Sequence, residues 1–298
     1  MTCICGRTAV PASWRPCMVA IIVFSVALLG ILGGVFGVGL AVAAKRFHVD
    51  IDPRVERVLG ALPGSNCGSC GYPGCEGCAI AIVKGDAPAN ACNPGGEKSA
   101  RLIAAIMSVD VGHHEPRRAV VHCKGGRLGA RDEFGYVGLS DCAAAMLLHG
   151  GPKKCKFGCL GFGNCKRTCP FGAIAMGADG LPLIFEEKCT ACGLCVKACP
   201  VGIISVLELK HRVFVGCSNP VAKGKEMKDA CSHGCIKCRL CVKVTKSGAV
   251  TWGERNLPSP DFDRWDDPSE AVTRCPAETF VDQRGSATPS AETVSMAS

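Results

Sequence analysis

The sequence has few aromatic residues and lacks the common nucleotide-binding and nucleophile motifs. Phe, Trp and Tyr make up 5% of its 298 residues, whereas it holds 37 glycines and 18 prolines. We therefore expect several small modules rather than one large apolar core. No G-x-G-x-x-G follows a predicted strand, and neither a P-loop nor a G-x-S-x-G elbow is present. This chain is accordingly expected to move electrons rather than hydrides.

Cysteine, in contrast, is abundant. The 24 cysteines are unusual for a disulfide scaffold of this length, because such scaffolds are usually short. Metal ligation in a reducing compartment is the better interpretation, with bound clusters stabilising modules that have thin apolar cores. The net charge of +8 favours an acidic partner or anionic lipid, but no groove-reading motif is present, so we expect no nucleic acid partner.

Residues 18–44 carry no charge, and a helix of this length spans roughly 40 Å, enough to cross a membrane core. A buried soluble helix and a cleaved signal are the alternatives, but the run is too long for a signal. Residues 1–17 fit nothing downstream, so we interpret them as an over-called start or an extension, with Met18 as the natural beginning. Positive charges after the span then predict that the soluble part is cytoplasmic, although Arg7 and Arg15 weaken that inference if the longer start is used.

The rest of the chain predicts an α+β protein. Apolar spacing indicates helices over 52–64, 96–110 and 140–151, the last with Ser140 or Asp141 as its N-cap, and a strand in EPRRAVVHCKGG. VFVGCSNP echoes AVVHCKGG, and CSHGCIKC echoes CKFGCLGF, which indicates an internal repeat. The expected domains after the membrane helix are a four-cysteine domain (45–110), a ferredoxin-like dicluster domain with an N-terminal extension (111–210), a degenerate ferredoxin-like repeat (211–281) and a disordered tail (282–298).

The first cysteine group lies in CGSCGYPGC and NAC. Its spacing is C-x2-C-x4-C-x16-C, which suits a [4Fe-4S] cluster because glycine-rich turns let four thiolates converge. A structural zinc site is the alternative, but zinc usually takes two C-x2-C pairs. The predicted ligands of cluster 1 are Cys67, Cys70, Cys75 and Cys92.

The motif CTACGLCVKACP is the clearest cluster signature. In two-cluster ferredoxins the fourth cysteine of such a run ligates the other cluster. By this crossing rule, Cys199 serves the preceding motif, and Cys169 from that motif closes the cluster of the later one. The predicted ligands of cluster 3 are Cys169, Cys189, Cys192 and Cys195.

The preceding motif, CKFGCLGFGNCKRTCP, is irregular because its middle position is Phe162. Cys155 is the candidate replacement, and a three-iron cluster that lacks one ligand is the competing interpretation. The predicted ligands of cluster 2 are Cys155, Cys159, Cys165 and Cys199.

The repeat at 231–250 has the same C-x2-C-x2-C spacing but ends in Thr245 instead of a cysteine. The crossing rule supplies a closing ligand from TRCPAETF. Trp265, Pro268 and Ala271 stand where a further cluster would need cysteines, so we expect one cluster in this repeat. Its predicted ligands are Cys235, Cys238, Cys241 and Cys275, which we number cluster 4.

At least three [4Fe-4S] clusters are therefore predicted, and a fourth is expected. The remaining thiols either ligate further clusters or are buried free cysteines. They are Cys78, Cys123, Cys142, Cys217 and Cys231.

Besides the anchor, four stretches of the chain are distinctive: DPRVERVLGALPGSNCGSCGYPGC, CNPGGE, GGPKKCKFGCLGFGNCKRTCPFGAI and CTACGLCVKACP. Together with the anchor, they resemble the B subunit of Rnf-type ion-translocating electron-transport complexes, in the longer, cluster-rich branch of that family. The resemblance runs from Met18 to about Phe280. Thr245 and the missing cysteines upstream of Cys275 depart from the pattern of that branch.

The resemblance implies an electron-entry subunit of a translocase-type enzyme complex that accepts electrons from reduced ferredoxin while the complex reduces NAD+ and moves Na+ or H+. It implies other membrane and flavin-bearing subunits as partners, and a single-pass position in the cell inner membrane. A stand-alone membrane-anchored redox sensor is the alternative function, and a zinc-rich binding module is a third.

Overall fold

The computed structural model describes residues 15–46, 52–111 and 115–284, with side chains from residue 20 onward. The chain divides into two units, residues 1–52 and 53–298, and each is described by itself. Most of the N-terminal stretch interpreted as an over-called start, and the tail after Arg284, lie outside the described residues.

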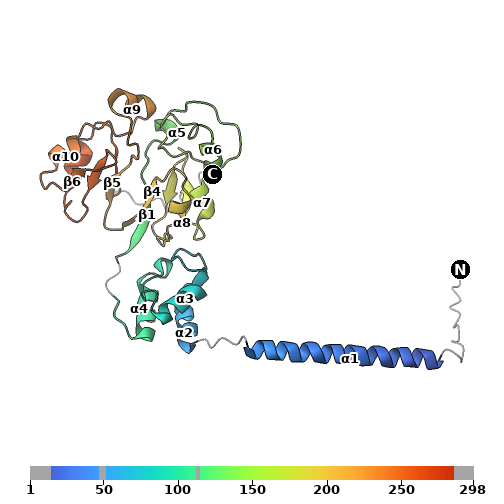
Figure 1. Ribbon diagram of the computed structural model, residues 1–298. Helices are drawn as coiled ribbons and strands as arrows, with labels where there is room; N and C mark the ends of the chain where they lie inside the picture. The colour runs from blue at the N-terminus through green and yellow to red at the C-terminus, as the bar shows by residue number, and fades with distance from the viewer. Residues whose placement is uncertain (1–14, 47–51, 112–114, 285–298) are drawn as a thin grey trace, which may run out of the picture. The chain divides into compact units, whose positions relative to one another are not determined.

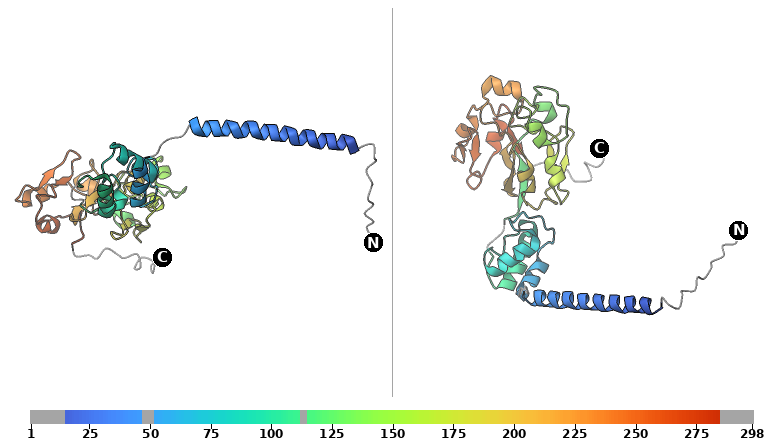
Figure 2. Two further views of the ribbon diagram at one scale, coloured as in Figure 1. Left: turned by 90° about the horizontal axis from the view of Figure 1, so that it is seen from below. Right: turned by 45° about the vertical axis from the view of Figure 1, so that its right-hand side comes forward.

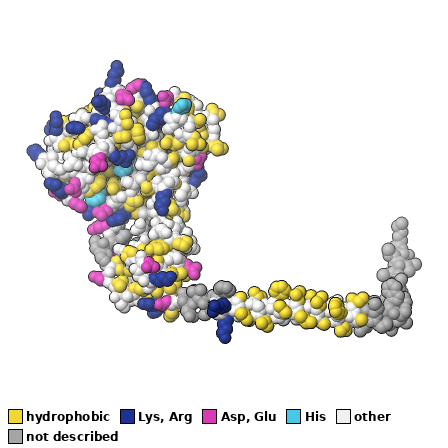
Figure 3. All heavy atoms as spheres, in the orientation of Figure 1, with side chains coloured by type: hydrophobic (Ala, Val, Ile, Leu, Met, Phe, Trp, Pro, Cys, Tyr) yellow, Lys and Arg dark blue, Asp and Glu magenta, His cyan; other side chains and the backbone are white. Residues whose placement is uncertain are grey.

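The first unit contains a single long helix, α1 (Arg15–Arg46). Its described side chains are exposed and almost all apolar, as Figure 3 shows along its length. By length and composition, the stretch Ala20–Arg46 can cross a membrane. Lys45 and Arg46 form its last turn, so the apolar run ends where the sequence predicts.

The second unit begins with a helical segment, residues 52–111. It contains α2 (Pro53–Ala61), α3 (Gly74–Lys84), the short 3-10 helix η2 (Asn93–Gly95) and α4 (Gly96–Met107). Val58, Ala79 and Ile103 are fully buried where the three α-helices pack together, which Figure 2 shows from two sides. The helices predicted over 52–64 and 96–110 are confirmed.

Residues 115–210 form a central segment with two small antiparallel sheets. β1 (Arg117–Val121) pairs with β4 (Ile204–Glu208), and β2 (Ile174–Met176) pairs with β3 (Pro182–Ile184). Its helices are short: α5 (Gly126–Gly129), α6 (Cys142–Met146), α7 (Asn164–Thr168) and α8 (Leu194–Ala198). The Asp141 carboxylate accepts hydrogen bonds from the backbone N–H groups of Ala143 and Ala144, which confirms its predicted N-cap role.

Residues 211–284 form a C-terminal segment beside the central one (Figure 1). β5 (Val213–Val215) pairs with β8 (Phe280–Asp282), and β6 (Val250–Trp252) pairs with β7 (Pro258–Pro260). The helices are α9 (Gly224–Ala230), α10 (Leu240–Val244) and α11 (Ser269–Thr273). A small apolar core of β5, β6 and buried Trp265 holds the segment together.

A buried ion pair joins the central and C-terminal segments. Glu186 forms ion pairs with Arg118 at 3.1 Å and with Arg212 at 2.7 Å, and the Arg118 side chain is only 3% exposed. Arg118 also donates to the backbone oxygen of His211 and to the side chain of Gln283. Arg118 therefore lies inside the fold rather than on its surface.

Replacing Glu186 should destabilise this junction strongly. In Glu186→Ala, the guanidinium groups of Arg118 and Arg212 face each other without a carboxylate, and breaking a buried pair costs about 3 kcal/mol. Chemical denaturation of the full chain in detergent, followed by circular dichroism, measures the change. The control Glu97→Ala removes the exposed pair with Arg101 and should cost less than about 1 kcal/mol. Equal losses in the two variants would contradict the assigned role.

Candidate iron-sulfur sites

The helical segment brings together a first set of cysteines around the start of α3. Burial raises the pKa of Cys92, and the nearby negative charges of Cys70, Cys75 and Cys67 add to the rise. The loop before α3 turns tightly through Gly68, Gly71 and Gly74, all at positive φ. The first set comprises Cys67, Cys70, Cys75 and Cys92, the group that the spacing predicts.

Cys78 lies one helical turn after Cys75 and is fully buried in the apolar core of the helical segment. Burial and the adjacent Cys70 raise its pKa to about 12. Its thiol therefore keeps its proton at neutral pH.

A small cavity in the central segment is lined by Cys169, Cys189, Cys192 and Cys195, which we call the third set. Burial and the charges of the other three, together with Cys165, raise the pKa of Cys195 to about 12. Ala191 and Gly193 adopt positive φ between these cysteines and so curl the chain around the cavity. The backbone N–H of Ala119 donates to the Cys189 sulfur at 3.4 Å.

The C-terminal segment has a matching cavity lined by Cys235, Cys238, Cys241 and Cys275, the fourth set. Lys237 and Arg239 adopt positive φ at the two places that correspond to Ala191 and Gly193. Non-glycine residues rarely adopt this conformation, so the loop is held in it by its surroundings. The chain thus brings Cys275 to the C-x2-C-x2-C loop from more than thirty residues away in the sequence.

Thr245 has a local structural role in this segment. Its hydroxyl donates to the backbone oxygen of Cys241 at 2.8 Å, at the end of α10. Trp265 and Ala271, at two of the positions where a further cluster would need cysteines, are buried in the apolar core, with the Trp265 ring 5.8 Å from that of Phe280. Apolar side chains therefore fill the part of the segment around Trp265 and Ala271.

The second set differs from the predicted ligands of cluster 2. Cys159, Cys165 and Cys199 lie near one another, but Cys142 joins them. Burial raises the pKa of Cys165, and the charges of Cys142 and Cys199 add to the rise. Burial raises the pKa of Cys159 to about 12, with Cys123, Cys165 and Cys142 contributing. We therefore define the second set as Cys142, Cys159, Cys165 and Cys199.

Asn164 fixes the position of Cys142. Its side-chain oxygen accepts from the Cys142 backbone N–H at 2.9 Å, while its amide donates to the Asp141 carboxylate at 2.7 Å. Because Asn164 immediately precedes Cys165, it ties α6 to α7. Phe162 occupies the middle position of the motif and packs on Tyr136 in the loop before α6. From the sequence, Cys142 remained among the unassigned thiols, although the absent middle cysteine of the motif was a signal for a replacement.

Cys155 lies instead with cysteines of the C-terminal segment. The Asn219 side-chain amide donates to the Cys155 sulfur at 3.5 Å. Burial raises the pKa of Cys217, and the charges of Cys155 and Cys123 add to the rise. Cys155 is therefore near Cys217, at the junction between the two segments.

Among the described residues from 20 onward, no group of three or more Cys, His, Asp or Glu side chains converges on one metal position.

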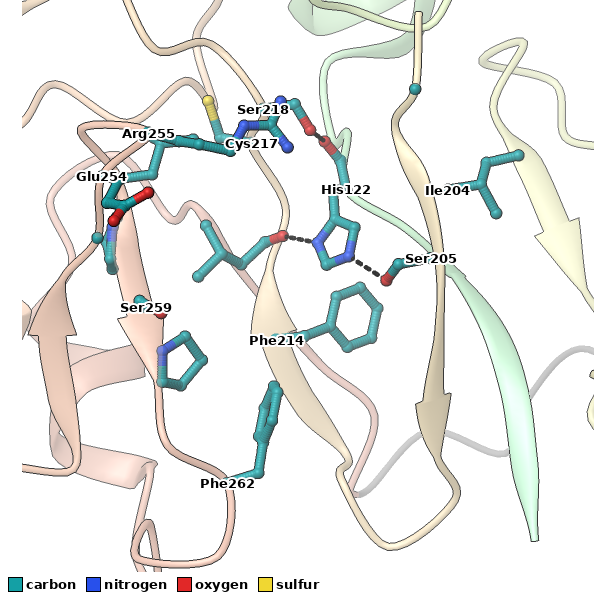
Figure 4. A pocket seen from close by; sticks show the side chains of 16 residues that line it. His122, Ile204, Ser205, Phe214, Cys217, Ser218, Glu254, Arg255, Ser259 and Phe262 are labelled. Carbon is teal, nitrogen blue, oxygen red and sulfur yellow. Dashed lines mark hydrogen bonds between the residues drawn. The ribbon is translucent and has the colours of Figure 1, made fainter. Parts of the chain in front are cut away.

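A cavity of about 570 Å³ lies between β4 and β7 and is lined by His122, Phe214 and Arg255 (Figure 4). Both ring nitrogens of His122 are occupied: Nδ1 bonds the Val215 oxygen and Nε2 bonds the Ser205 hydroxyl, each at 2.7 Å. Burial lowers the pKa of His122, so the ring is neutral. Its two hydrogen bonds join the central and C-terminal segments.

Two family models match the chain. Residues 62–94 match a family described as a putative Fe-S cluster, and residues 182–205 match a 4Fe-4S binding domain. The first match contains all of the first set. The second contains three cysteines of the third set and Cys199.

Similar curated proteins cover most of the chain. It is 44% identical over 87% of its length to the B subunit of the Na+-translocating ferredoxin:NAD+ oxidoreductase complex of Acetobacterium woodii, and covers 77% of that protein. It is 41% identical to the B subunit of the ion-translocating oxidoreductase complex of Methanosarcina acetivorans, over 78% of this chain and 88% of the relative. The B subunit of the proton-translocating ferredoxin:NAD+ oxidoreductase complex of Clostridium ljungdahlii is also 41% identical, over 86% of this chain and 90% of the relative.

These identities, over more than two thirds of each relative, confirm the resemblance seen in the cysteine motifs: the chain belongs to the family of B subunits of Rnf-type ion-translocating oxidoreductase complexes.

Proposed function

We propose that this chain is the membrane-anchored electron-transfer subunit of an ion-translocating ferredoxin:NAD+ oxidoreductase, and that it relays electrons from reduced ferredoxin through [4Fe-4S] clusters. The observation that carries the proposal is the grouping of cysteines into sets that neighbour one another. Membership of a family of complex subunits favours this function over a stand-alone sensor.

The thiols present fit iron-sulfur clusters chemically. All of them except Cys238 are buried or half-buried. Two neighbouring thiolates would repel each other, so a thiol in such a set tends to keep its proton. Burial and neighbouring thiols raise the pKa of Cys235 to about 12. As thiolates, these cysteines would hold the iron of a cluster, which would supply the positive charge that balances them. When bound, clusters of this kind carry single electrons. The proposed ligands are the first, second, third and fourth sets, which implies four clusters.

The first, third and second cysteine sets are neighbours in that order. Burial raises the pKa of Cys192, and the charge of Cys67 adds to the rise, which supports neighbouring positions for the first and third sets. Cys165 contributes likewise to the raised pKa of Cys195, which links the second and third sets. This order supports a relay rather than isolated structural sites.

We propose that the central and C-terminal segments are two ferredoxin-like repeats, the second degenerate. Their matching strand pairs support this: β1 pairs with β4 as β5 pairs with β8. Equivalent backbone bonds also occur next to equivalent cysteines, from His122 to the Ile203 oxygen and from Gly216 to the Thr279 oxygen. The proposed domain boundaries remain 45–110, 111–210 and 211–281.

We further propose that α1 anchors the subunit in the cell inner membrane with its soluble part on the cytoplasmic side. Lys45 and Arg46 end α1 on the side of the cysteine-rich part, which agrees with the tendency of positive charges to stay in the cytoplasm. Other membrane and flavin-bearing subunits of the complex would then be its partners.

The fourth set is the proposed point of contact with ferredoxin. Cys238 is exposed. The stretch 231–250 around it contains four basic residues and no acidic one. Positive charge around an exposed redox site steers an acidic protein partner into a productive orientation.

Removing Cys275 tests the ligands of the fourth set. The variant Cys275→Ala should lose about four irons per chain relative to the unmodified protein, because a [4Fe-4S] cluster needs its fourth thiolate here. Iron and sulfide are determined on full-length protein purified anaerobically in detergent. Cys78→Ala is the matched control, also a buried cysteine beside a cluster set, and it should lose none. Retention of all iron by Cys275→Ala would contradict the assignment.

Reversing surface charge near Cys238 tests the contact with ferredoxin. Lys243→Glu with Lys246→Glu should lower the second-order rate constant for reduction by reduced ferredoxin about tenfold at low ionic strength, and the deficit should shrink in high salt. Stopped-flow absorbance gives the rate. Lys98→Glu with Arg101→Glu, an equal charge change on α4, should have little effect. A larger effect from the α4 variant would move the contact to the helical segment.

A further inference from the structure

A threonine is buried in the wall of the cavity that the fourth set lines. Thr279 stands four residues after Cys275, directly before β8, and is 2% exposed. It lines this cavity together with the four cysteines. Its hydroxyl oxygen is buried and has no hydrogen-bond partner among the described residues.

The other threonines of the C-terminal segment all use their hydroxyl groups. Those of Thr245, Thr251 and Thr273 each donate to a backbone oxygen. Burying a hydroxyl group without a hydrogen bond is unfavourable, because its bonds to water are lost without replacement. The hydroxyl of Thr279 lacks an acceptor among the described protein atoms, so a group bound in the cavity has to supply one.

Equivalent positions of the central segment carry apolar side chains. Ala173 and Ile203 stand four residues after the two C-P cysteines of that segment, as Thr279 does after Cys275, and each is also 2% exposed. The backbone oxygens of Ile203 and Thr279 accept hydrogen bonds from the residues that follow β1 and β5, respectively. The fold therefore does not require a hydroxyl group at this buried place.

The backbone of the same residue already directs a donor toward the cysteines. The backbone N–H of Thr279 donates to the Cys275 sulfur at 3.4 Å. The hydroxyl places a second donor at the same wall. In a cavity lined by four cysteines, the acceptors that remain for it are the sulfur atoms of the thiolates and of a bound cluster.

The cavity of the third set repeats this arrangement with another threonine. Thr190 lines it beside Cys189 and Cys192, and its hydroxyl is buried without a hydrogen bond of regular geometry. Burial raises the pKa of Cys192, and the Thr190 hydroxyl acts against that rise, which supports a position near the Cys192 sulfur. In the part of the chain that the structure describes, the hydroxyls of Thr190 and Thr279 are the only buried ones without a partner, and both residues line a cavity with four cysteines.

We infer that the hydroxyl groups of Thr279 and Thr190 each donate a hydrogen bond to a sulfur atom of the [4Fe-4S] cluster held in the cavity they line, and raise the reduction potential of that cluster. A donor at sulfur stabilises the reduced cluster, which carries one more negative charge than the oxidised one. The inference rests on the proposed iron-sulfur function and deepens it, because it names residues other than the ligands that set how readily two clusters accept an electron.

The position of Thr279 agrees with electron entry at the fourth set. This set contains the exposed Cys238, the proposed point of contact with ferredoxin. A raised potential at this cluster favours transfer of an electron from ferredoxin onto the chain. Ile203, four residues after Cys199, gives the second set no corresponding donor.

Redox titration of the full-length protein in detergent, followed by electron paramagnetic resonance, tests the inference. Thr279→Val removes the hydroxyl and keeps a similar shape, so one-electron reduction of the fourth-set cluster should become about tenfold less favourable, a fall of about 59 mV. The loss of a signal in Cys275→Ala identifies this cluster. Thr190→Val should instead shift the third-set signal, identified by its loss in Cys189→Ala. Both valine variants should keep the iron content of the unmodified protein.

Thr279→Ser separates the hydrogen bond from packing. It keeps the hydroxyl group and removes a methyl group, so the fourth-set potential should stay near that of the unmodified protein. Thr273→Val, the same substitution at a hydroxyl that bonds a backbone oxygen, should also leave it unchanged. After exchange into D2O, electron-nuclear double resonance of the reduced fourth-set cluster should show one coupled deuteron fewer in Thr279→Val than in Thr279→Ser.

Three results would overturn the inference: an unchanged potential in Thr279→Val, an equal shift in Thr279→Ser, or the same coupled deuterons in both variants. In each of them the protein still holds its iron, so the proposed function stands. Thr279→Ala is compared with Thr279→Ser by the same measurements if Thr279→Val does not assemble the cluster. Absence of iron from the unmodified protein would overturn the proposed function itself.

Discussion

The crowding of buried thiols is the interaction on which this protein depends. Cysteine side chains belong to the apolar core of every segment, and Cys75, Cys165, Cys195 and Cys235 are each at most 8% exposed. Such groups repel one another as thiolates and pack as small apolar side chains when protonated. Metal binding removes the repulsion and closes loops that short helices and two-stranded sheets hold only weakly. We therefore regard folding of residues 53–284 and cluster assembly as coupled processes.

Much of the architecture was predictable because it is local. The helices α2 and α4 follow apolar spacing, and α6 follows its Asp141 cap. The third and fourth sets come from motifs in which three cysteines lie within seven residues, so spacing alone brings them together. Even the distant Cys275 was assigned to the fourth set from the sequence, because in paired ferredoxin motifs the last cysteine of one motif ligates the cluster of the other.

The second set could not be assigned in this way. Phe162 removes a ligand from the motif, and two nearby cysteines compete to replace it. Cys155 is closer in sequence, but Cys142 is brought to Cys165 by the contacts of Asn164, which spacing does not encode. Long-range packing, rather than spacing, brings Cys142 beside Cys165.

The central claim is that the cysteine sets form a continuous path from the exposed fourth set to the first. Mixing the full-length protein with less than one equivalent of reduced ferredoxin, followed by rapid freezing and electron paramagnetic resonance, tests it most directly. We expect a signal from the first-set cluster, identified by its loss in Cys92→Ala, to grow within milliseconds. A signal that stays confined to the fourth-set cluster would contradict it.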